Sequence, residues 1–420
     1  MNTLNRVRLA RPSGRQLEYQ DWELGLFLHF GIRTFYEGHR DWDGKPMTAS
    51  GFNPKGLDCG QWAKTAAAAG VKYAVLTAKH HDGFALWPSR YTDYSVANTP
   101  WKNGKGDVVR EYVEACRLYG VKVGLYYSPA DANPRLYADG KEYDDYFIGQ
   151  IGEILSGYGE IDVLWFDGCG SEGHEYDWVR ITREIRSMQP NVLIFNMGDP
   201  DFRWIGNEAG MAPIPLWNTV DAVDFSVNTT EKQALAESIW LPAECDCMMR
   251  DVNWFYSDAD EDTVKSVREL LGIYYLSVGR GANVLINIGP DRQGLLPKAD
   301  CRSLLGLRAE LDRRFGDPVA TLASASLDAD AVSWQFSQPQ RVDHIVLQED
   351  LKDGEHIRRF AIDVVGNPHS QPITVWEGCN VGHKAICHFP QVKVKSLTVR
   401  ILESNGAWSL RSGSVYQTER

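Results

Sequence analysis

The sequence lacks the features of a membrane-bound, exported or nucleic-acid-binding chain. No uninterrupted apolar run approaches the roughly 20 residues that a membrane-spanning helix needs. No apolar segment of a signal peptide follows the basic residues within 1–14, so we expect a soluble chain in the cytoplasm, or in the periplasm or outside the cell if a leader was removed. The 44 Lys and Arg residues are outnumbered by 56 Asp and Glu residues, and the net charge of −12 argues against nucleic acid or an anionic membrane as a partner.

Cysteine pairs of zinc sites and glycine-rich nucleotide loops are also missing. The eight cysteines are scattered, with one Cys245-x-Cys247 pair but no C-x-x-C repeat, so we expect mostly buried free thiols and would test Cys379 and Cys387 for a disulfide. No G-x-G-x-x-G follows a strand-like run, and no glycine-rich cradle for phosphate is present. The sequence therefore predicts no metal and no cofactor, and it leaves the oligomeric state open.

From about residue 20 to 300, the chain contains an alternation of strand-like and helix-like runs. Short runs rich in β-branched and aromatic residues predict strands, and longer runs that stop at a glycine predict helices. Gly70 and Gly120 stand where a left-handed helix end is expected. In the first half the expected strands are 24–30, 73–77, 121–127, 161–166 and 192–195, and the expected helices are 60–69, 107–119, 143–155 and 176–188.

The alternation loosens after residue 196 and then returns. We expect strands six and seven at 204–207 and 238–243, a helix over 260–278, the eighth strand over 283–288 and a last helix over 298–315. Eight βα units close into a barrel, so we predict an α/β fold of the (β/α)8 or TIM-barrel type. A doubly wound open sheet is the alternative, although its glycine fingerprint is missing.

The residue pattern of the sequence changes after Gly316. Short alternating runs separated by Pro, Gly and Asp, such as 331–336, 343–349 and 396–402, predict an antiparallel β-sandwich. We therefore expect two domains, a catalytic barrel over 1–317 and a sandwich over 318–420.

Polar residues follow most of the predicted barrel strands. The run 161–166 ends on Asp167, and a carboxylate at the edge of a core is rarely tolerated unless it is paired, hydrogen-bonded or functional. In a βα barrel the reactive groups collect at the C-terminal ends of the strands. Their mixture suits a sugar, whose hydroxyls need donors and acceptors and whose C–H faces lie on aromatic rings. The strand-end residues are His29, Phe30, His80, His81, Asp82, Tyr126, Asp131, Asp167, Glu208, Glu244, Asp246, Arg250 and Trp254.

Two of these carboxylates fit the cleavage of a glycosidic bond. A retaining glycosidase needs one ionised carboxylate as nucleophile and one protonated carboxyl as acid, about 5 Å apart. Asp167 and Glu208 are the predicted pair, because Asp167 ends a rigid strand and partial burial on a longer loop would favour the protonated form of Glu208. Glu244 is the alternative acid, with Asp260 and Glu261 behind it.

Five ordered motifs carry a resemblance to a known family: GLFLHFG at 25–31, YAVLTAKHHDGFALWPS at 73–89, GLYYSP at 124–129, VLWFDG at 163–168 and GANVLINIGPDRQG at 281–294. The chain is similar to the glycoside hydrolase family 29 α-L-fucosidases, and around GKGDVV, WFDGCGSEG, WIGNEAG, LPAECDC and WFY it resembles the branch that prefers α-1,3/1,4-linked fucosides. The resemblance implies a retaining exo-α-L-fucosidase that acts on fucosylated oligosaccharides or glycoconjugates, with Asp167 as nucleophile and Glu208 as acid/base.

The same resemblance implies a fucose pocket formed by His29, His80, His81, Tyr126, Trp165 and Arg250, to which we add Asp41, Trp42 and Trp254. Asp41 and Trp42 stand where family members have Glu-Trp. Residues 130–132 read Ala-Asp-Ala where the branch has Trp-Asp-Arg, and residues 248–253 replace its Ser-Ile-Arg-Pro-Gly, so the leaving-group side departs from the pattern. The C-terminal domain resembles the galactose-binding-like sandwich of these enzymes.

Two alternatives from other functional classes remain open. His80, His81 and Asp82 could hold a metal ion in a hydrolase on the same barrel, although successive strand residues point to opposite faces. A non-catalytic fucose-binding protein would bind the sugar without releasing it from a glycan. Sensitivity to chelators identifies the first alternative, and fucose binding without product release identifies the second.

Overall fold

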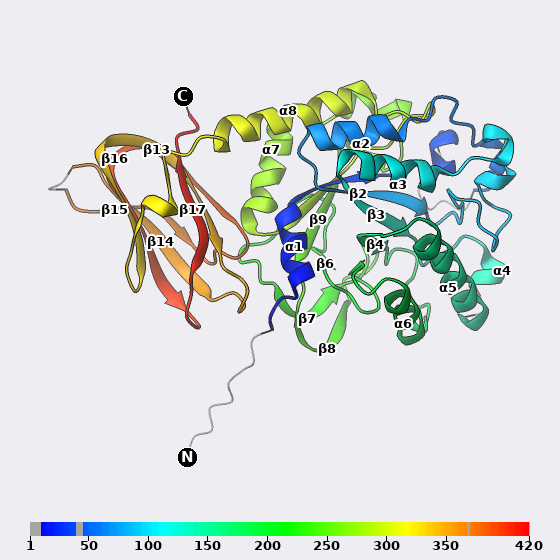
Figure 1. Ribbon diagram of the computed structural model, residues 1–420, viewed down its shortest axis with the longest axis horizontal. Helices are drawn as coiled ribbons and strands as arrows, with labels where there is room; N and C mark the ends of the chain where they lie inside the picture. The colour runs from blue at the N-terminus through cyan, green and yellow to red at the C-terminus, as the bar shows by residue number, and fades with distance from the viewer. Residues whose placement is uncertain (1–9, 39–44, 139, 368–369, 420) are drawn as a thin grey trace, which may run out of the picture.

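The computed structural model describes residues 10–38, 45–138, 140–367 and 370–419, and its larger part is a barrel of eight parallel strands (Figure 1). Phe195 forms a parallel bridge with Phe202, so the two edges of the sheet almost meet. The predicted barrel is confirmed. In spatial order its strands are β5 (Leu193–Phe195), β4 (Val163–Phe166), β3 (Lys122–Tyr127), β2 (Tyr73–Lys79), β1 (Leu24–Leu28), β10 (Asn283–Asn287), β9 (Ala243–Met248) and β6 (Arg203–Trp204).

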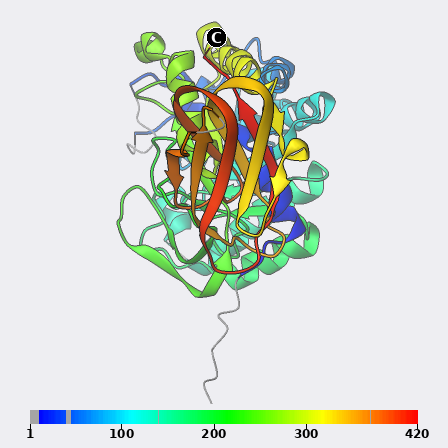
Figure 2. The same cartoon turned by 90° about the vertical axis from the view of Figure 1, so that its left-hand side faces the viewer.

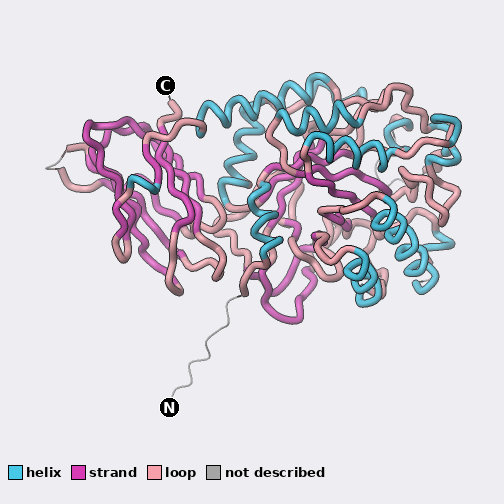
Figure 3. Tube along the Cα trace, in the orientation of Figure 1, coloured by secondary structure: helices cyan, strands magenta, loops and turns pink. Residues whose placement is uncertain are grey.

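The barrel strands are buried on both faces, as parallel strands covered by helices must be. Every residue of β1, β2 and β4 is buried. Helices surround the strands, and Figure 3 shows them in cyan around the magenta barrel. They are α1 (Gly14–Trp22), α2 (Cys59–Ala68), α3 (Val108–Tyr119), α4 (Pro134–Tyr137), α5 (Gly140–Gly157), α6 (Trp178–Met188), α7 (Val267–Leu276) and α8 (Lys298–Phe315).

Local capping signals fix several helix ends. The side chains of Asp58, Asp107 and Asp177 accept hydrogen bonds from the first turns of α2, α3 and α6. Gly120 adopts the left-handed conformation predicted for the end of α3, with φ of 69°. The helix predicted over 260–278 is shorter, because Ser266 forms a capping box with Glu269 and α7 begins only after it.

The prediction of the seventh strand was wrong. Residues 232–240 form β8 (Lys232–Trp240), which pairs with β7 (Thr219–Asp224) in an antiparallel hairpin outside the barrel. The barrel strand is β9, which starts only after Pro242. Proline has no N–H to donate to a β-ladder, so it separates the two strands within what the sequence presents as one run.

The predicted antiparallel C-terminal domain is confirmed, and Figure 2 shows it in front of the barrel. Its seven strands enclose a core that includes Trp334, Leu347, Phe360 and Leu397. The long strands β13 and β16 link the others into one hydrogen-bonded order. The strands are β11 (Ala320–Thr321), β12 (Ser326–Leu327), β13 (Ala331–Glu349), β14 (Ile357–Val365), β15 (Ile373–Gly378), β16 (Ala385–Ser404) and β17 (Leu410–Tyr416).

Polar contacts join this domain to the barrel. Glu355 accepts hydrogen bonds from the backbone and side-chain nitrogens of Asn218 at 2.8 and 3.0 Å, and Arg411 pairs with Asp21 at 2.7 Å. All eight cysteines are free, as expected for most of them, and the disulfide considered between Cys379 and Cys387 is absent. Cys379 is exposed whereas Cys387 is buried in the core, so the two thiols lie in different environments.

Among the helices that the structure describes, none is both long and apolar enough to cross a bilayer.

Candidate active site

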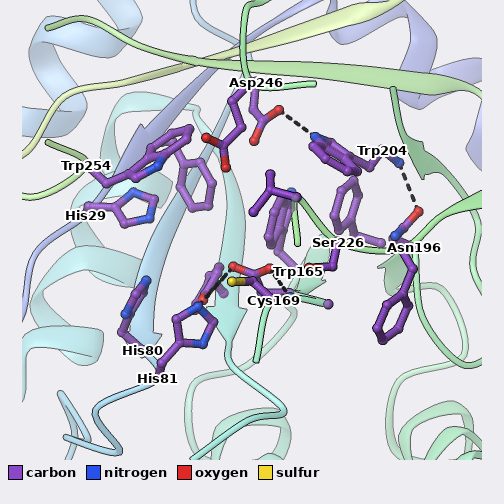
Figure 4. A pocket seen from close by; sticks show the side chains of 18 residues that line it. His29, His80, His81, Trp165, Cys169, Asn196, Trp204, Ser226, Asp246 and Trp254 are labelled. Atoms are coloured by element: carbon purple, nitrogen blue, oxygen red, sulfur yellow. Dashed lines mark hydrogen bonds and ion pairs between the residues drawn. The ribbon is translucent and has the colours of Figure 1, made fainter. Parts of the chain in front are cut away.

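A cavity of about 210 Å³ lies at the C-terminal ends of the barrel strands (Figure 4). This volume is below the roughly 300–1,000 Å³ typical of sites for drug-sized ligands and is suited to a single sugar ring. Eight of the predicted site residues line it: His29, His80, His81, Tyr126, Trp165, Asp167, Glu208 and Trp254. Asp41 and Trp42 lie outside the described residues.

Asp167 follows β4 directly, and two groups donate hydrogen bonds to its carboxylate. The hydroxyl of Tyr126 donates to Oδ2 at 2.9 Å, and the backbone N–H of Cys169 donates to Oδ1 at 2.9 Å. Nε2 of His81 lies 3.5 Å from Oδ2. The side chain stays about a quarter exposed to the cavity, so this carboxylate is both fixed and accessible.

The orientation of His81 follows from its hydrogen bonds. Its Nδ1 lies 2.6 Å from the hydroxyl of Ser128, which itself donates to the carbonyl of Ala130 at 2.7 Å. Nδ1 therefore carries the proton, and Nε2 is directed at Asp167. Burial lowers the pKa of His81, and the charge of Asp167 opposes that shift.

His29 and His80 form the opposite side of the cavity as neutral imidazoles. Asn287 donates to the carbonyl of Trp254 at 2.7 Å, so its Oδ1 accepts from Nδ1 of His29, also at 2.7 Å. Burial lowers the pKa of His29 to about 3 and that of His80 well below its usual range. The buried Nδ1 of His80 has no hydrogen-bond partner among the described residues, which suits it to a ligand hydroxyl.

The floor of the cavity is aromatic. The ring of Trp165 stacks on Tyr126 at a centroid distance of 5.4 Å and on Phe195 at 3.9 Å. Its indole N–H donates to Glu244 at 2.8 Å. Glu244 also accepts from Tyr19 at 2.8 Å and from Tyr73 at 2.5 Å, and it does not line the cavity.

The structure therefore places Glu244, the alternative acid, outside the cavity. Burial raises the pKa of this carboxyl, while the three donors oppose the shift. All three donors point at it from the barrel interior, so Glu244 supports the floor from below and cannot reach a ligand above it. Asp260 and Glu261, the remaining alternatives, also lie outside the cavity.

Glu208 lies on a loop after β6 that is attached to β9. The N–H of Gly210 donates to the carbonyl of Asp246 at 3.0 Å, and Ala209 forms a bridge with Cys247. Asn207 braces the loop through a 3.0 Å hydrogen bond to the carbonyl of Met211. Glu208 itself is exposed at the cavity, in contrast to the partial burial expected from the sequence.

Asp246 is a buried carboxyl in the same cavity, 4% exposed. The indole N–H of Trp204 donates to its Oδ1 at 2.8 Å, as the dashed line in Figure 4 shows. Burial, and next the negative charge of Glu208, raise the pKa of Asp246 well above its usual value. Two carboxyl groups with different environments therefore lie on the side of the cavity formed by β6 and β9.

Arg250, which was predicted to bind fucose, does not line this cavity. Its guanidinium binds Asp300 through two hydrogen bonds of 2.9 and 3.0 Å and Asp260 through one of 3.1 Å. The carbonyl of Ser257 accepts a fourth at 3.0 Å. Two buried carboxylates thus neutralise the buried arginine, and its charge holds the segment after β9 to α8.

The sequence reasoning missed several residues that line the cavity. Asn196 follows β5, and the rule that reactive groups follow barrel strands could have found it. The same rule identified Asp246 as a strand-end residue, but the sequence did not indicate its role. The β7–β8 hairpin, which the sequence did not predict, contributes Phe225, Ser226 and Val227. In the described part of the chain, no three His, Cys, Asp or Glu side chains are grouped as metal ligands would be.

Comparisons with known proteins identify relatives of this chain. Residues 13–312 match the family described as α-L-fucosidase. The chain is 39% identical to α-L-fucosidase 1 of Arabidopsis thaliana over 304 residues, which cover 70% of this chain and 59% of the plant protein. It is 34% identical over 437 residues to a protein of Oryza sativa assigned to the same family, with coverage of 94% and 82%.

Solved structures give the same result across both domains. A glycoside hydrolase 29 family member from a rumen bacterium superimposes with a TM-score of 0.88 at 31% identity, over 98% of this chain and 78% of that one. A Bacteroides thetaiotaomicron protein assigned to the α-L-fucosidases gives 0.88 at 35% identity, over 97% of both chains. The chain belongs to the α-L-fucosidase family of glycoside hydrolases.

Proposed function

We propose that this protein is a retaining exo-α-L-fucosidase in which Asp167 is the nucleophile and Glu208 is the acid/base. The observation that carries the proposal is the presence of both carboxyl groups at one small cavity, with Asp167 fixed by two hydrogen-bond donors and Glu208 exposed. The three neutral or weakly basic imidazoles and the aromatic floor match a ligand with several hydroxyls and an apolar face.

The reaction follows from these positions. The carboxylate of Asp167 attacks the anomeric carbon of fucose while Glu208 protonates the glycosidic oxygen, and the leaving sugar departs. Glu208, now ionised, removes a proton from water, and the resulting hydroxide displaces Asp167 from the anomeric carbon. Fucose leaves with its original configuration, and Glu208 is protonated again.

The fucose itself would be held mainly by the side of the cavity formed by β1, β2 and β3. With Nδ1 bonded to Asn287, His29 offers a bare Nε2 as an acceptor, and the unpartnered Nδ1 of His80 can bond a second hydroxyl. Trp254, whose ring centroid is 5.0 Å from that of His29, adds an apolar surface. Neutral imidazoles bind hydroxyls without adding positive charge beside an oxocarbenium-like transition state.

Azide rescue tests the two assignments separately. Asp167→Ala should lose activity by roughly three orders of magnitude or more while keeping its thermal midpoint, and azide should restore turnover and give β-L-fucosyl azide. Glu208→Ala should cleave an aryl fucoside with a good leaving group, and azide should trap the fucosyl-enzyme as α-L-fucosyl azide. Asp246→Ala is the matched control and should form neither azide. An active Asp167→Ala enzyme would refute the assignment.

We further propose a preference for α-1,3- and α-1,4-linked fucose on branched oligosaccharides, on the motifs shared with that branch of the family. The test is fucose release from a panel of α-1,2-, α-1,3-, α-1,4- and α-1,6-fucosylated oligosaccharides. Cleavage confined to the 1,3- and 1,4-linked members is expected. Comparable rates on the 1,2- or 1,6-linked members would contradict the linkage proposal without affecting the assignment of Asp167.

A further inference from the structure

The tip of the β7–β8 hairpin, defined as residues 225–228, forms one wall of the cavity mouth. Phe225, Ser226 and Val227 line the cavity together with Gly168 and Cys169 from the end of β4. Figure 4 shows Ser226, Cys169 and Asn196 around the same space. Ser226 is buried, whereas Val227 is 52% exposed, so the tip presents an apolar side chain at the opening rather than at the floor.

Close backbone packing fixes the tip against the segments that carry both catalytic carboxyl groups. A side chain at Gly168, the residue after Asp167, would overlap the carbonyl oxygen of Phe225. A Cβ at Gly206, two residues before Glu208, would lie 2.9 Å from the side chain of Asp224. Asn196 also donates to the carbonyl of Asp224 at 2.8 Å. The hairpin therefore cannot shift without disturbing one of these segments.

A carboxylate from the β4–α6 loop holds the tip in place. Glu172 accepts hydrogen bonds from the hydroxyl of Ser226 and, at 3.2 Å, from the amide of Asn228. The same amide lies 3.3 Å from the sulfur of Cys169. Although burial opposes it, these donors lower the pKa of Glu172, so the carboxylate is ionised and the hydrogen bonds are charge-assisted.

We propose that the hairpin tip contacts the sugar that carries the fucose, with Val227 packed against an apolar C–H face of that sugar, and so determines which fucosides are cleaved. The inference rests on the proposed function. An acid must reach the glycosidic oxygen, so the leaving sugar lies on the side of Glu208, which is the side against which the hairpin packs. The imidazoles occupy the opposite side.

Two substrates separate this contact from catalysis. One is a branched α-1,3/1,4-fucosylated trisaccharide, and the other is α-L-fucosyl fluoride, whose leaving atom is too small to reach the wall. In Val227→Ser, the ratio of kcat/KM for the trisaccharide to kcat/KM for the fluoride should fall about tenfold. The matched control is Val179→Ser, which removes the same apolar atoms from a 79% exposed site on α6 and should leave the ratio unchanged.

The hydrogen bonds to Glu172 provide a second test. Glu172→Ala removes the oxygen that accepts both hydrogen bonds and should lower the ratio as Val227→Ser does, whereas Glu172→Gln keeps an acceptor oxygen and should largely preserve it. An unchanged ratio in Val227→Ser, or an equal loss on both substrates, would overturn the proposal. Failure of the wild-type enzyme to hydrolyse the fluoride would instead reject the proposed function, so the two failures are distinguishable.

Discussion

Replacing Arg250 by Met should destabilise the barrel without weakening fucose binding. The guanidinium and the carboxylates of Asp260 and Asp300 are almost completely buried, at 6, 1 and 1% side-chain exposure. Removing one partner of a buried ion pair leaves an uncompensated charge and costs about 3–5 kcal/mol. At roughly 2 °C per kcal/mol for a barrel of this size, the thermal midpoint should fall by about 6–10 °C.

The assay compares this variant with Arg292→Met. Arg292 pairs with Glu37 and Asp258, but its side chain is 32% exposed, so water screens the interaction and its loss should cost less than about 1 kcal/mol. Both guanidinium groups lie over the ring of Tyr256, at 5.0 and 5.7 Å, which matches the two sites for aromatic packing. Thermal midpoints would be measured for both variants. Fucose dissociation constants would then be measured at a temperature below the midpoint of the less stable variant.

A double variant decides whether the cost arises from the unpaired charge. Arg250→Met combined with Asp300→Leu removes the bidentate pair together, and apolar replacement of a buried pair is often nearly neutral. The double variant should therefore recover part of the lost stability, while the buried Asp260 still lacks its ion pair with Arg250. The reasoning is refuted if Arg250→Met keeps the wild-type midpoint but binds fucose more than tenfold more weakly, because Arg250 would then act as a ligand group.

Two further predictions follow from single hydrogen bonds and from burial. Tyr126→Phe removes the hydroxyl that donates to Asp167 and should lower kcat/KM roughly 10- to 100-fold. The control Tyr127→Phe loses only a hydrogen bond to Gln150 on the other face of β3 and should change kcat/KM little. Equal losses of kcat/KM in the two variants would contradict the proposed role of Tyr126. Burial raises the pKa of Glu349 from 4.5 to about 7, so the folded state holds this proton more tightly than the unfolded state. The stabilisation that comes from protonated Glu349 is fully present below pH 4.5, and about 3 kcal/mol of the free energy of unfolding is lost as the pH rises past 7. Urea unfolding at several pH values should show this loss in the wild type but not in Glu349→Gln.

The first half of the barrel and its site could be predicted because the information is local. Strands β1 to β4 are contiguous apolar runs, and His29, His80 and Asp167 follow β1, β2 and β4 directly in the chain. In a parallel barrel the ends of these strands meet at one mouth, so position along the chain is enough to bring the side chains together. The boundary between the two domains stays a prediction, with α8 ending at Phe315 and β11 starting at Ala320.

The second half of the barrel was harder to predict, because its structure depends on contacts between residues that are distant in the sequence. β6 has only two residues, too few for a periodic pattern, and the β7–β8 hairpin contributes to the site through packing on Gly168. Arg250 resembles a ligand group in the sequence because its partner Asp300 lies 50 positions away on α8. Hairpin docking and buried ion pairing are tertiary interactions, and neither leaves a short-range signal in the sequence.

The carboxyl groups near the cavity differ mainly in their surroundings, and this difference supports the proposed division of roles. Glu244 has three donors beneath the floor, so it serves Trp165 and never meets the ligand. Asp167 combines a Tyr donor and a backbone N–H with access to the cavity, which suits an ionised nucleophile. Asp246 is buried beside Glu208, so ionising both groups together is unfavourable. Glu208 alone among these four is classed as exposed, which suits the proposed acid/base because such a group must exchange its proton with solvent.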